Sequence, residues 1–253
     1  MLFRPMIALA AGVAAVLMPP ALREAGHSAE ASAEPGTFAG IYDFYLGGIW
    51  GGEFAIDARL GDGRYRAEAA GKTKGLVSFV WNAGFAATTD GALAAPGYVP
   101  ERYAADAYTA RRSQKVEVRY ADGAPREVAA EPPFEPKPWA IEPAAQAGTS
   151  DPLSAMLAGL ALQRGEALCD RRIEVFDGRR RYVVELGAPV ADQGMMRCAA
   201  LYRRIAGFKP AQMERPDWPL DLWFAAGPDG LWHLDRAMGE MKFGIATLNL
   251  REG

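Results

Sequence analysis

Segments in which apolar and polar residues alternate recur along the chain from residue 40 onward. In the clearest segment, apolar side chains occupy every second position: Phe54, Ile56, Ala58 and Leu60. Because successive side chains of a β-strand point to opposite faces, this period of two is typical of strands with one buried face. Turn signals separate the segments, among them Gly47-Gly48 and Gly61-Asp62-Gly63. The pattern predicts about ten to twelve antiparallel strands.

The regular alternation predicts a mainly β fold in which one face of the sheet meets water or lines a cavity. A strongly curved antiparallel sheet or incomplete β-barrel, with one packed α-helix on its concave side, satisfies both conditions. The aromatic-rich segment 76–87 fits another strand, and the helix has too few apolar residues to cover the whole sheet. Phe79, Trp81 and Phe85 are therefore candidate contacts for a hydrophobic ligand. A fully filled interior would argue against this hypothesis.

One helix is predicted over residues 151–165. Asp151 is a favourable N-cap, and Pro152 stands at the first helical position, where its missing N–H costs nothing. Gly165 is placed to end the helix. The helix carries an apolar stripe at i, i+3, i+4 and i+7 that predicts packing on the sheet or, alternatively, a partner-binding face: Leu153, Met156, Leu157 and Leu160.

A β-hairpin is predicted just after this helix. Asp177-Gly178 is a favoured pair for a two-residue type I′ turn, which would pair Phe176 with Arg179. In that register Glu174 faces Arg181 across the strands, a favourable ion pair. The opposite face carries the side chains that we expect to be buried: Ile173, Val175, Tyr182, Val184 and Leu186. A loop over 187–197 would follow.

The first 33 residues are typical of a secretory signal peptide. A positive Arg4 precedes an Ala-rich apolar run over 6–18, and Ala31-Ser32-Ala33 offers a cleavage site. The apolar run is short for a transmembrane helix, so we expect no membrane span after cleavage, with an uncleaved anchor as the alternative. Residues 34–253 are long enough for a single β-rich domain. The net charge of −3 argues against a general nucleic-acid binder.

The two cysteines, Cys169 and Cys198, flank the predicted hairpin. Taken alone, they could be a disulfide, two unrelated thiols or a redox pair. Their spacing is far from C-x-x-C, and no metal-binding set accompanies them. Export to an oxidising compartment favours the disulfide, which would clamp the open end of the hairpin.

Residues able to carry catalysis are sparse. His233 is the only histidine after the expected cleavage, and no nucleophile elbow or phosphate loop is present, so we expect no catalytic residue, metal or cofactor. Arginine groups at 171–172, 179–181 and 203–204 could bind phosphates or other anionic groups. Alternatively, they form a solvated turn. Arg180 is notable because alternation places it beside Tyr182 on the apolar side.

Several local patterns together resemble the domain-of-unknown-function family 3108, exported proteins of Gram-negative bacteria. The patterns span most of the chain after the signal: Tyr42-Asp43-x-Tyr45-x-Gly47-Gly48-Ile49, Gly52-Glu53, Pro100-Glu101-Arg102-Tyr103, Gly148-Thr149-x-Asp151-Pro152-Leu153-Ser154, Val175-Phe176-Asp177-Gly178-Arg179-Arg180-Arg181-Tyr182 and Tyr202-x-Arg204-Ile205-x-Gly207-Phe208. The resemblance implies a periplasmic location and brings no reaction or catalytic residue with it.

These observations favour a non-enzymatic periplasmic protein that binds a hydrophobic or amphipathic envelope component, possible partners being a lipid or another part of the envelope. Its role would be in cell-envelope maintenance, and the candidate ligand contacts are Phe79, Trp81, Phe85, Arg180 and Tyr182. The alternative is a structural or interaction module without a small ligand. A hydrolase acting on cell-wall or lipid substrates ranks third, because paired carboxylates occur but no cleft can be read from the sequence. The oligomeric state does not follow from these residues.

Overall fold

A computed structural model describes residues 36–94, 97–160, 168–227, 230–241 and 244–251 of the 253-residue chain. The predicted signal segment, residues 1–33, lies outside the described residues, as does Gly165, the predicted end of the helix.

The described strands form one antiparallel sheet of 13 strands. Each strand pairs with its neighbour in sequence, and β1 also pairs with β13, which joins the two halves of the chain. The first half contains β1 (Gly36–Leu46), β2 (Ile49–Gly61), β3 (Arg64–Thr73), β4 (Ala83–Ala94), β5 (Gly97–Thr109), β6 (Arg112–Ala121) and β7 (Ala124–Glu131). The second half contains β8 (Arg171–Phe176), β9 (Arg181–Asp192), β10 (Met195–Ala206), β11 (Asp217–Ala226), β12 (Trp232–Met241) and β13 (Gly244–Leu250).

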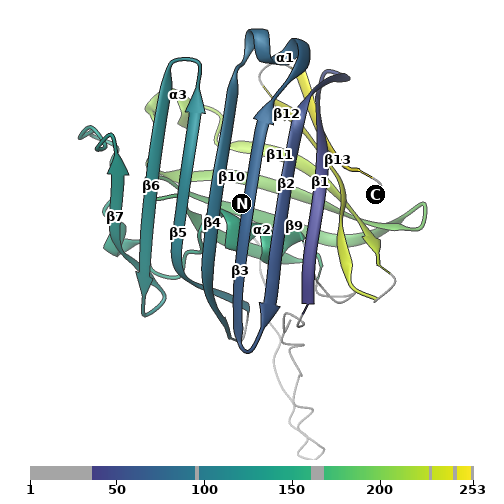
Figure 1. The fold of residues 1–253 in the computed structure, drawn as a ribbon, viewed down its shortest axis with the longest axis horizontal. Coiled ribbons are helices and arrows are strands. Elements are labelled where there is room, and N and C mark those ends of the chain that lie inside the picture. The colour runs from purple at the N-terminus through teal and green to yellow at the C-terminus, as the bar shows by residue number, and fades with distance from the viewer. Residues whose placement is uncertain (1–35, 95–96, 161–167, 228–229, 242–243, 252–253) are drawn as a thin grey trace, which may run out of the picture.

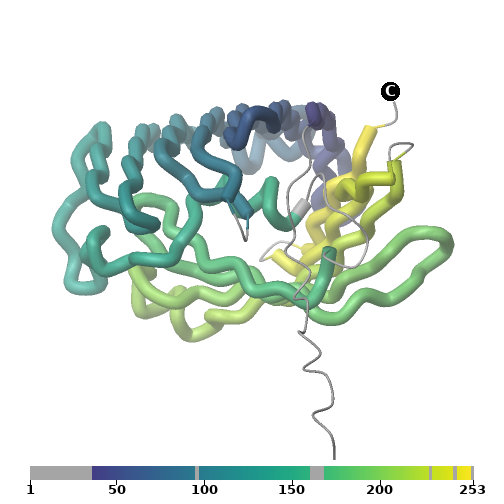
Figure 2. Tube along the Cα trace, turned by 90° about the horizontal axis from the view of Figure 1, so that it is seen from below, coloured from purple at the N-terminus to yellow at the C-terminus, as the bar shows by residue number. Residues whose placement is uncertain are grey.

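The sheet bends at β13 and β12, so that its second half crosses behind the first (Figure 1). Figure 2 shows the result as two layers with a helix between them. The order of the strands leaves β7 and β8 as unpaired edges, so the sheet is not closed. The predicted fold class, a strongly curved sheet or incomplete barrel with a packed helix, is confirmed. The helical elements are α1 (Gly75–Val80), η1 (Pro143–Ala145), α2 (Pro152–Leu160) and α3 (Pro210–Met213).

Helix α2 fills the space between the layers. Leu153 and Leu157 of the predicted stripe are buried in the core, and Met156 packs against it. Asp151 is the predicted N-cap: its Oδ1 accepts the backbone N–H groups of Leu153 and Ser154, both at 2.9 Å. The stripe therefore packs on the sheet, which was the first of the two roles predicted for it; the other was a partner-binding face.

The connection before α2 covers part of the gap between the two edges of the sheet. Ser150 lies along β8: its N–H donates to the carbonyl oxygen of Glu174, and its own carbonyl accepts from Phe176, both at 2.8 Å. Two residues earlier, the N–H of Gly148 donates to the carbonyl of Gly123 in the β6–β7 turn at 2.9 Å. The free edge of β8 is thereby partly paired, which stabilises an otherwise open ladder.

The β8–β9 hairpin has a four-residue connection, Asp177–Arg180, and the predicted two-residue turn is wrong. Phe176 pairs with Arg181 and not with Arg179. The carboxylate of Asp177 accepts the backbone N–H groups of Arg179 at 2.9 Å and Arg180 at 2.7 Å. These two bonds stabilise the wider loop, because an aspartate side chain can replace a backbone acceptor in a turn.

The register error amounts to two residues, so it leaves every side chain on the predicted face. The inner face carries Tyr182 and its expected neighbours, and Leu186 faces Arg171 across the strands. The predicted ion pair between Glu174 and Arg181 is present as a diagonal contact, with Nε 3.2 Å from Oε2.

Two other predicted elements differ from the structure. Residues 187–197, predicted as a loop, continue β9 and begin β10 through a tight turn at Gln193-Gly194, where both residues have positive φ. Glutamine is rare in such turns, so the sequence signal was weak. Residues 76–87, predicted as one strand, contain helix α1 and the start of β4.

The predicted disulfide joins Cys169 and Cys198, whose Cα atoms lie 5.7 Å apart. Cys169 lies just before β8, and Cys198 lies in β10, so the bond spans the intervening strand β9. Both residues are buried in the core. The disulfide fastens the edge strand β8 to the interior of its layer.

We expect Gly52→Ala to lower the free energy of unfolding by about 2 kcal/mol, measured by urea denaturation. Gly52 has φ +147°, and a Cβ there would lie 2.2 Å from the carbonyl oxygen of Lys72. The matched control is Gly61→Ala, because a Cβ at Gly61 meets nothing within 4 Å and its φ is not positive. Equal stability of the two variants would contradict the close approach at Gly52.

Candidate functional site

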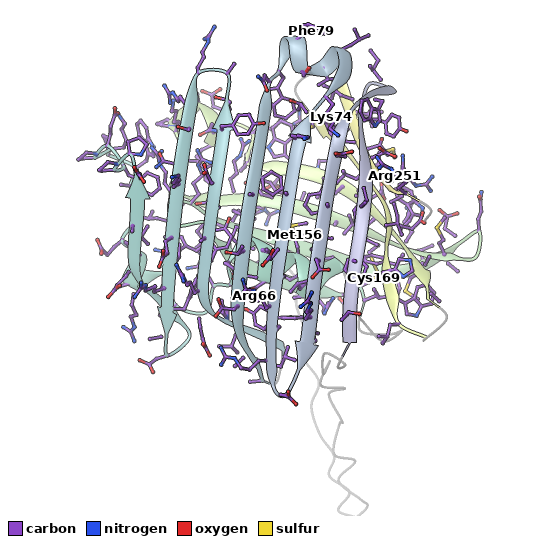
Figure 3. All side chains as sticks on the ribbon, viewed as in Figure 1. Arg66, Lys74, Phe79, Met156, Cys169 and Arg251 are labelled. Carbon is purple, nitrogen blue, oxygen red and sulfur yellow. A yellow bond between two sulfur atoms is a disulfide. The ribbon has the colours of Figure 1, made fainter. Side chains whose placement is uncertain are left out.

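Helix α1 presents an apolar face to solvent. Leu76, Phe79 and Val80 stand at i, i+3 and i+4, a spacing that ordinarily forms a buried face. Their exposed fractions are 70%, 87% and 91%, whereas Val77 is only 8% exposed. The helix lies at one end of the first layer, and Phe79 is at its outer side (Figures 1 and 3). The apolar face of α1 therefore meets solvent, whereas the apolar face of a helix ordinarily packs on the core.

Two neighbouring connections add exposed apolar residues to the same end. The β1–β2 turn leads into Ile49 and Trp50, and the strands β12 and β13 meet near Met241 and Ile245. The N–H of Gly47 donates to the carbonyl of Ile245 at 2.8 Å, so the two connections lie side by side. We call the combined surface the apolar tip: Ile49, Trp50, Leu76, Phe79, Val80, Trp81, Met241 and Ile245.

The apolar tip is fixed to the sheet by a few close contacts. Val77 faces Gly51. A Cβ added at Gly51 would lie 3.0 Å from the Cγ2 atom of Val77 and 3.1 Å from the ring of Phe44. The backbone N–H of Lys74 donates to the carbonyl of Gly51 at 2.7 Å. The ring of Trp81 meets Phe44 edge-on, with 6.4 Å between centroids. The absence of a side chain at Gly51 allows the helix to sit against β2.

Charged residues lie beside the apolar tip in a group that we call the collar: Asp43, Glu53, Lys74 and Arg251. The Nε1–H of Trp50 donates to Asp43 Oδ1 at 2.9 Å, and Arg251 donates to the same oxygen at 2.5 Å. Lys74 forms an ion pair with Glu53. The hydrogen bond from Arg251 holds the pKa of Asp43 below its ordinary value, and that from Lys74 does the same for Glu53. The collar thus keeps its charges, and the position of Trp50, as pH falls toward the ordinary carboxylate range.

The opposite end of the first layer is polar. The turns there are built around Asp62 and Asp122, and the guanidinium group of Arg64 contacts both carboxylate oxygens of Glu101 at 3.0 and 2.8 Å. In residues 61–64 and 121–124, no large apolar side chain is exposed. The two ends of the layer therefore differ in chemistry, and the apolar surface is gathered at one of them.

The three aromatic residues predicted to contact a ligand lie near the apolar tip in different settings. Phe79 extends from α1 into solvent, and Trp81 follows the helix. Phe85 faces the interior from β4 and stacks on Phe54, with 6.0 Å between ring centroids above Gly71. All three are exposed by more than a third, so the aromatic surface is accessible as predicted. Its position on the concave face is wrong for Phe79, because residues 75–80 are helical.

The structure shows the hollows of the surface on the outer face of the first layer. Three open depressions have volumes of about 670, 460 and 390 Å³. Small outward side chains leave room for them, among them Ala39, Ala55, Ala70, Ala86 and Ala104. None of the three is lined by α2, whose apolar side chains pack against core side chains. These depressions therefore give no support to a ligand held inside the sheet.

Arg180 and Tyr182 lie in the second layer. Tyr182 packs against Tyr202 with 4.9 Å between ring centroids, and burial raises the pKa of its hydroxyl well above the ordinary value. The guanidinium carbon of Arg180 is 5.6 Å from the ring centroid of Phe208. Within the described ranges, no hydrogen bond, ion pair or ring contact joins these two residues to the apolar tip. The five predicted ligand contacts therefore belong to two separate places.

The arginines that the sequence grouped together have different surroundings. Arg171 donates to the carbonyl of Ala158 at 2.5 Å and helps to hold α2. Others are committed to ion pairs: Arg172 with Glu174 and Glu185, Arg181 with Glu174, and Arg203 with Asp217. Arg179, Arg180 and Arg204 contact aromatic rings.

A buried polar cluster links α2 to the first layer. Asp151 Oδ2 accepts the hydroxyls of Ser154 at 2.5 Å and Thr89 at 2.9 Å, and the hydroxyls of Tyr65 and Ser154 lie 2.6 Å apart. Burial raises the pKa of Asp151 despite these hydrogen bonds. Each of the four residues is at most 2% exposed, so no substrate reaches them in this conformation. The cluster holds the helix in place.

Other chemistry is limited. His233 contacts Phe38, with 6.5 Å between ring centroids. Across the part of the chain that the structure describes, no group of three or more His, Cys, Asp and Glu residues could hold a metal ion. In those same ranges, no helix has both the length and the apolar composition that crossing a membrane requires.

Sequence reasoning missed the apolar tip as a surface. The signal was present, because residues 76, 79 and 80 have helical spacing and follow a lysine and a glycine. The segment is so short, however, that its aromatic content also fits a strand. The sequence also gave no sign that the β12–β13 connection joins the same end, since that contact depends on the pairing of β1 with β13.

Comparison with known proteins supports the family but brings no activity. None of the curated proteins matches this sequence. Among solved structures, the chain is similar to a β-barrel-like protein of the domain of unknown function DUF1849 from Brucella abortus, with 12% identity, a TM-score of 0.48, and coverage of 88% of this chain and 100% of that one. Residues 41–248 match the family described as "Protein of unknown function (DUF3108)". Because this match covers most of the sequence, the chain belongs to the DUF3108 family.

Proposed function

We propose that this chain is an exported, non-enzymatic protein of the periplasm that attaches to the lipid surface of the envelope through its apolar tip. The observation that supports the proposal is the outward apolar face of α1, where Leu76, Phe79 and Val80 are at least 70% exposed. A monomeric protein seldom leaves large apolar side chains clustered in water unless they meet a partner or a membrane. Envelope maintenance is the role that this attachment would serve.

The shape and charge of this end favour a lipid surface over a protein groove. The apolar residues project from a helix and two chain reversals, and a deformable bilayer accepts such a projection without a complementary pocket. Trp50 and Trp81 lie at its base, in the position that tryptophan takes at a membrane interface. The β5–β6 turn, which carries Arg111 and Arg112, is joined to this end by a 2.9 Å bond from Ala110 N–H to the carbonyl of Asn82. These cations would face anionic headgroups.

The expected attachment is weak and reversible. Burial of one large apolar side chain contributes about 1.5–3 kcal/mol, so the three residues of α1 together contribute several kcal/mol before the cost of association. A single acyl chain on a protein likewise gives only marginal membrane binding. A protein with this affinity would visit the membrane and leave it again, which suits contact with an amphipathic component.

The disulfide supports export, because such bonds persist in oxidising compartments. The predicted signal segment points the same way. A non-enzymatic role is supported by the burial of the Asp151 cluster and by the commitment of most exposed carboxylates to ion pairs. The contacts that α2 makes with core side chains favour the alternative of an interaction module without a small ligand, and the experiment below separates the two.

The test is flotation of the full chain, expressed with its own N-terminal segment and purified after export, with vesicles of phosphatidylethanolamine and phosphatidylglycerol. We expect the wild type to float with the vesicles and the double variant Phe79→Ser/Val80→Ser to bind at least ten-fold less, since it loses about two buried side chains. Both residues are almost fully exposed, so the fold should be unaffected.

The matched control is Val190→Ser, which removes an exposed apolar side chain from β9, outside the tip. It should float like the wild type. If the wild type does not bind vesicles, or if the tip variant binds as well as the control, attachment through the tip is ruled out and the interaction module becomes the better interpretation.

A further inference from the structure

In the second layer, arginine side chains and aromatic rings contact one another in a continuous row. We call this row the ladder: Arg180, Phe208, Arg204, Trp218 and Arg215. Arg180 and Arg204 both contact the ring of Phe208, with guanidinium carbons 5.6 and 5.5 Å from its centroid. Arg204 also lies 5.2 Å from the ring of Trp218, which Arg215 contacts at 4.2 Å. The members come from the β8–β9 connection, the end of β10, and the segment around α3 that leads into β11. Three cations are thus held at fixed positions by two rings.

Close backbone packing brings the distant parts of this ladder together. A Cβ on Gly207 would lie 2.4 Å from the carbonyl oxygen of Arg179 and 2.9 Å from the Cα of Arg180. Only a residue without a side chain allows the β8–β9 connection to rest on the end of β10, and φ +82° at Gly207 favours glycine as well. Phe208, the next residue, is buried.

Negative charge is unevenly distributed along the ladder. Arg215 pairs with Glu240 at 2.9 Å at one end, whereas the arginines next to Phe208 have few acidic neighbours. Within the described residues, Arg179, Arg204 and Lys209 have no carboxylate within 4.0 Å, whereas Arg181 and Arg203, close to them in sequence, are paired. The one acidic neighbour of Arg180 is Asp177, 3.9 Å away, and burial raises the pKa of that carboxyl. Like charges held near one another without counter-charge favour an incoming anion.

The guanidinium groups are already partly oriented for binding an anion. Arg204 donates to the carbonyl oxygens of Gln212 at 2.6 Å and Arg215 at 3.2 Å, which fixes its plane, and its buried Nε has no partner in the described residues. Arg180 retains solvent exposure of 41% of its side chain, and Lys209 is exposed. Planar guanidinium groups match the geometry of phosphate oxygens, and aromatic contacts reduce the freedom that binding would otherwise remove.

We infer that the surface formed by Arg179, Arg180, Arg204 and Lys209 is a binding site for a phosphate group. The phosphate is carried either by an anionic lipid or by a soluble phosphorylated compound, and the chemistry of recognition is the same for both. The site rests on different residues from the apolar tip, so it stands or falls independently of the proposed attachment to the lipid surface.

The test uses two probes and isothermal titration of the full, exported chain. Inorganic tripolyphosphate represents a soluble phosphate, and dihexanoyl phosphatidic acid, used below its micellar concentration, represents a lipid headgroup. We expect binding of at least one probe, weakened by salt, and a Kd at least ten-fold higher in Arg180→Gln/Lys209→Gln, because each lost charge-assisted bond is a substantial fraction of the affinity. Tripolyphosphate alone would identify a soluble ligand, and phosphatidic acid alone would identify a lipid.

The matched control is Arg59→Gln, which removes an exposed arginine from the outer face of β2 and should leave the Kd unchanged. Thermal melting of each variant separates a loss of binding from a loss of fold. Two results would overturn the inference: neither probe binding the wild type, or the control weakening binding as much as the double variant. The second result would show a general effect of positive charge.

Discussion

Replacement of Asp151 by alanine is expected to lower the free energy of unfolding by about 3 kcal/mol or more, which urea denaturation at pH 7 will measure. The substitution removes the N-cap of α2, leaving the N–H groups of Leu153 and Ser154 without their acceptor. It also removes the carboxylate that accepts the hydroxyls of Ser154 and Thr89 in the interior, so Thr89 keeps only weaker acceptors such as the carbonyl of Arg102 at 3.2 Å. Unsatisfied buried donors are costly, and this residue serves four of them.

Asp151→Asn is the matched control, and we expect it to cost less than about 1 kcal/mol at pH 7. The amide oxygen can still accept the two backbone N–H groups, and its NH₂ group can donate to hydroxyls that rotate to accept. If the asparagine variant were as unstable as the alanine variant, the charge of the carboxylate would be essential, and the account of a cap and hydrogen-bond acceptor would be wrong.

The same pair of proteins tests the pKa of Asp151. Burial raises this pKa in the folded state, so its contribution to stability is fully present below the unfolded value of about 3.9 and is lost as pH rises through the folded value. The advantage of the wild type over Asp151→Asn should therefore shrink from acid toward neutral pH. Asp177 titrates in the same direction in both proteins, so its effect cancels. A constant difference across this range would contradict the direction of the shift.

Reduction of the disulfide is expected to lower the melting temperature by about 10 °C. By the chain-entropy relation, a loop of 29 residues between Cys169 and Cys198 corresponds to about 3–4 kcal/mol, and each kcal/mol shifts the midpoint of a domain this size by about 2–4 °C. Cys198→Ser should melt near the temperature of the reduced wild type, and added reductant should not change it further.

Equal melting of the wild type with and without reductant would show that the bond adds no stability to the fold. A smaller effect than expected would be informative too, since β8 is also held by its pairing with β9 and by Ser150 on its free edge. The double variant Cys169→Ala/Cys198→Ala provides the control without a buried hydroxyl. It should match the reduced protein more closely than the serine variant does.

Much of the fold could be predicted because it depends on local patterns. The alternation in β2 predicted its inner and outer faces, and Asp151-Pro152 predicted the start of α2. The pairing of Cys169 with Cys198 was predicted from there being two cysteines and a predicted signal peptide. The hairpin at Asp177-Gly178 was predicted on the correct faces but in the wrong register. A buried carboxylate stabilised a wider loop there, and its burial depends on residues far away in sequence.

The candidate sites were less accessible to sequence reasoning. Phe79 and Arg180 were both predicted as candidate contacts of a single ligand. The structure separates them, because Phe79 belongs to a helix at one end of the first layer while Arg180 packs on Phe208 in the second. Neither neighbourhood is encoded in a local period, since each depends on which strands meet when the sheet bends.

The sequence by itself determined which side of each clear strand is apolar, where α2 begins, and which two sulfurs can join, since each is a property of neighbouring residues or of a unique pair. Only the tertiary structure decided that the apolar face of α1 meets water, that Arg180 and Arg204 both contact the ring of Phe208, and that the Asp151 cluster is sealed from solvent. Exposure and charge balance are set by everything that surrounds a side chain, and here the bend at β12 and β13 brings those surroundings together from both halves of the chain.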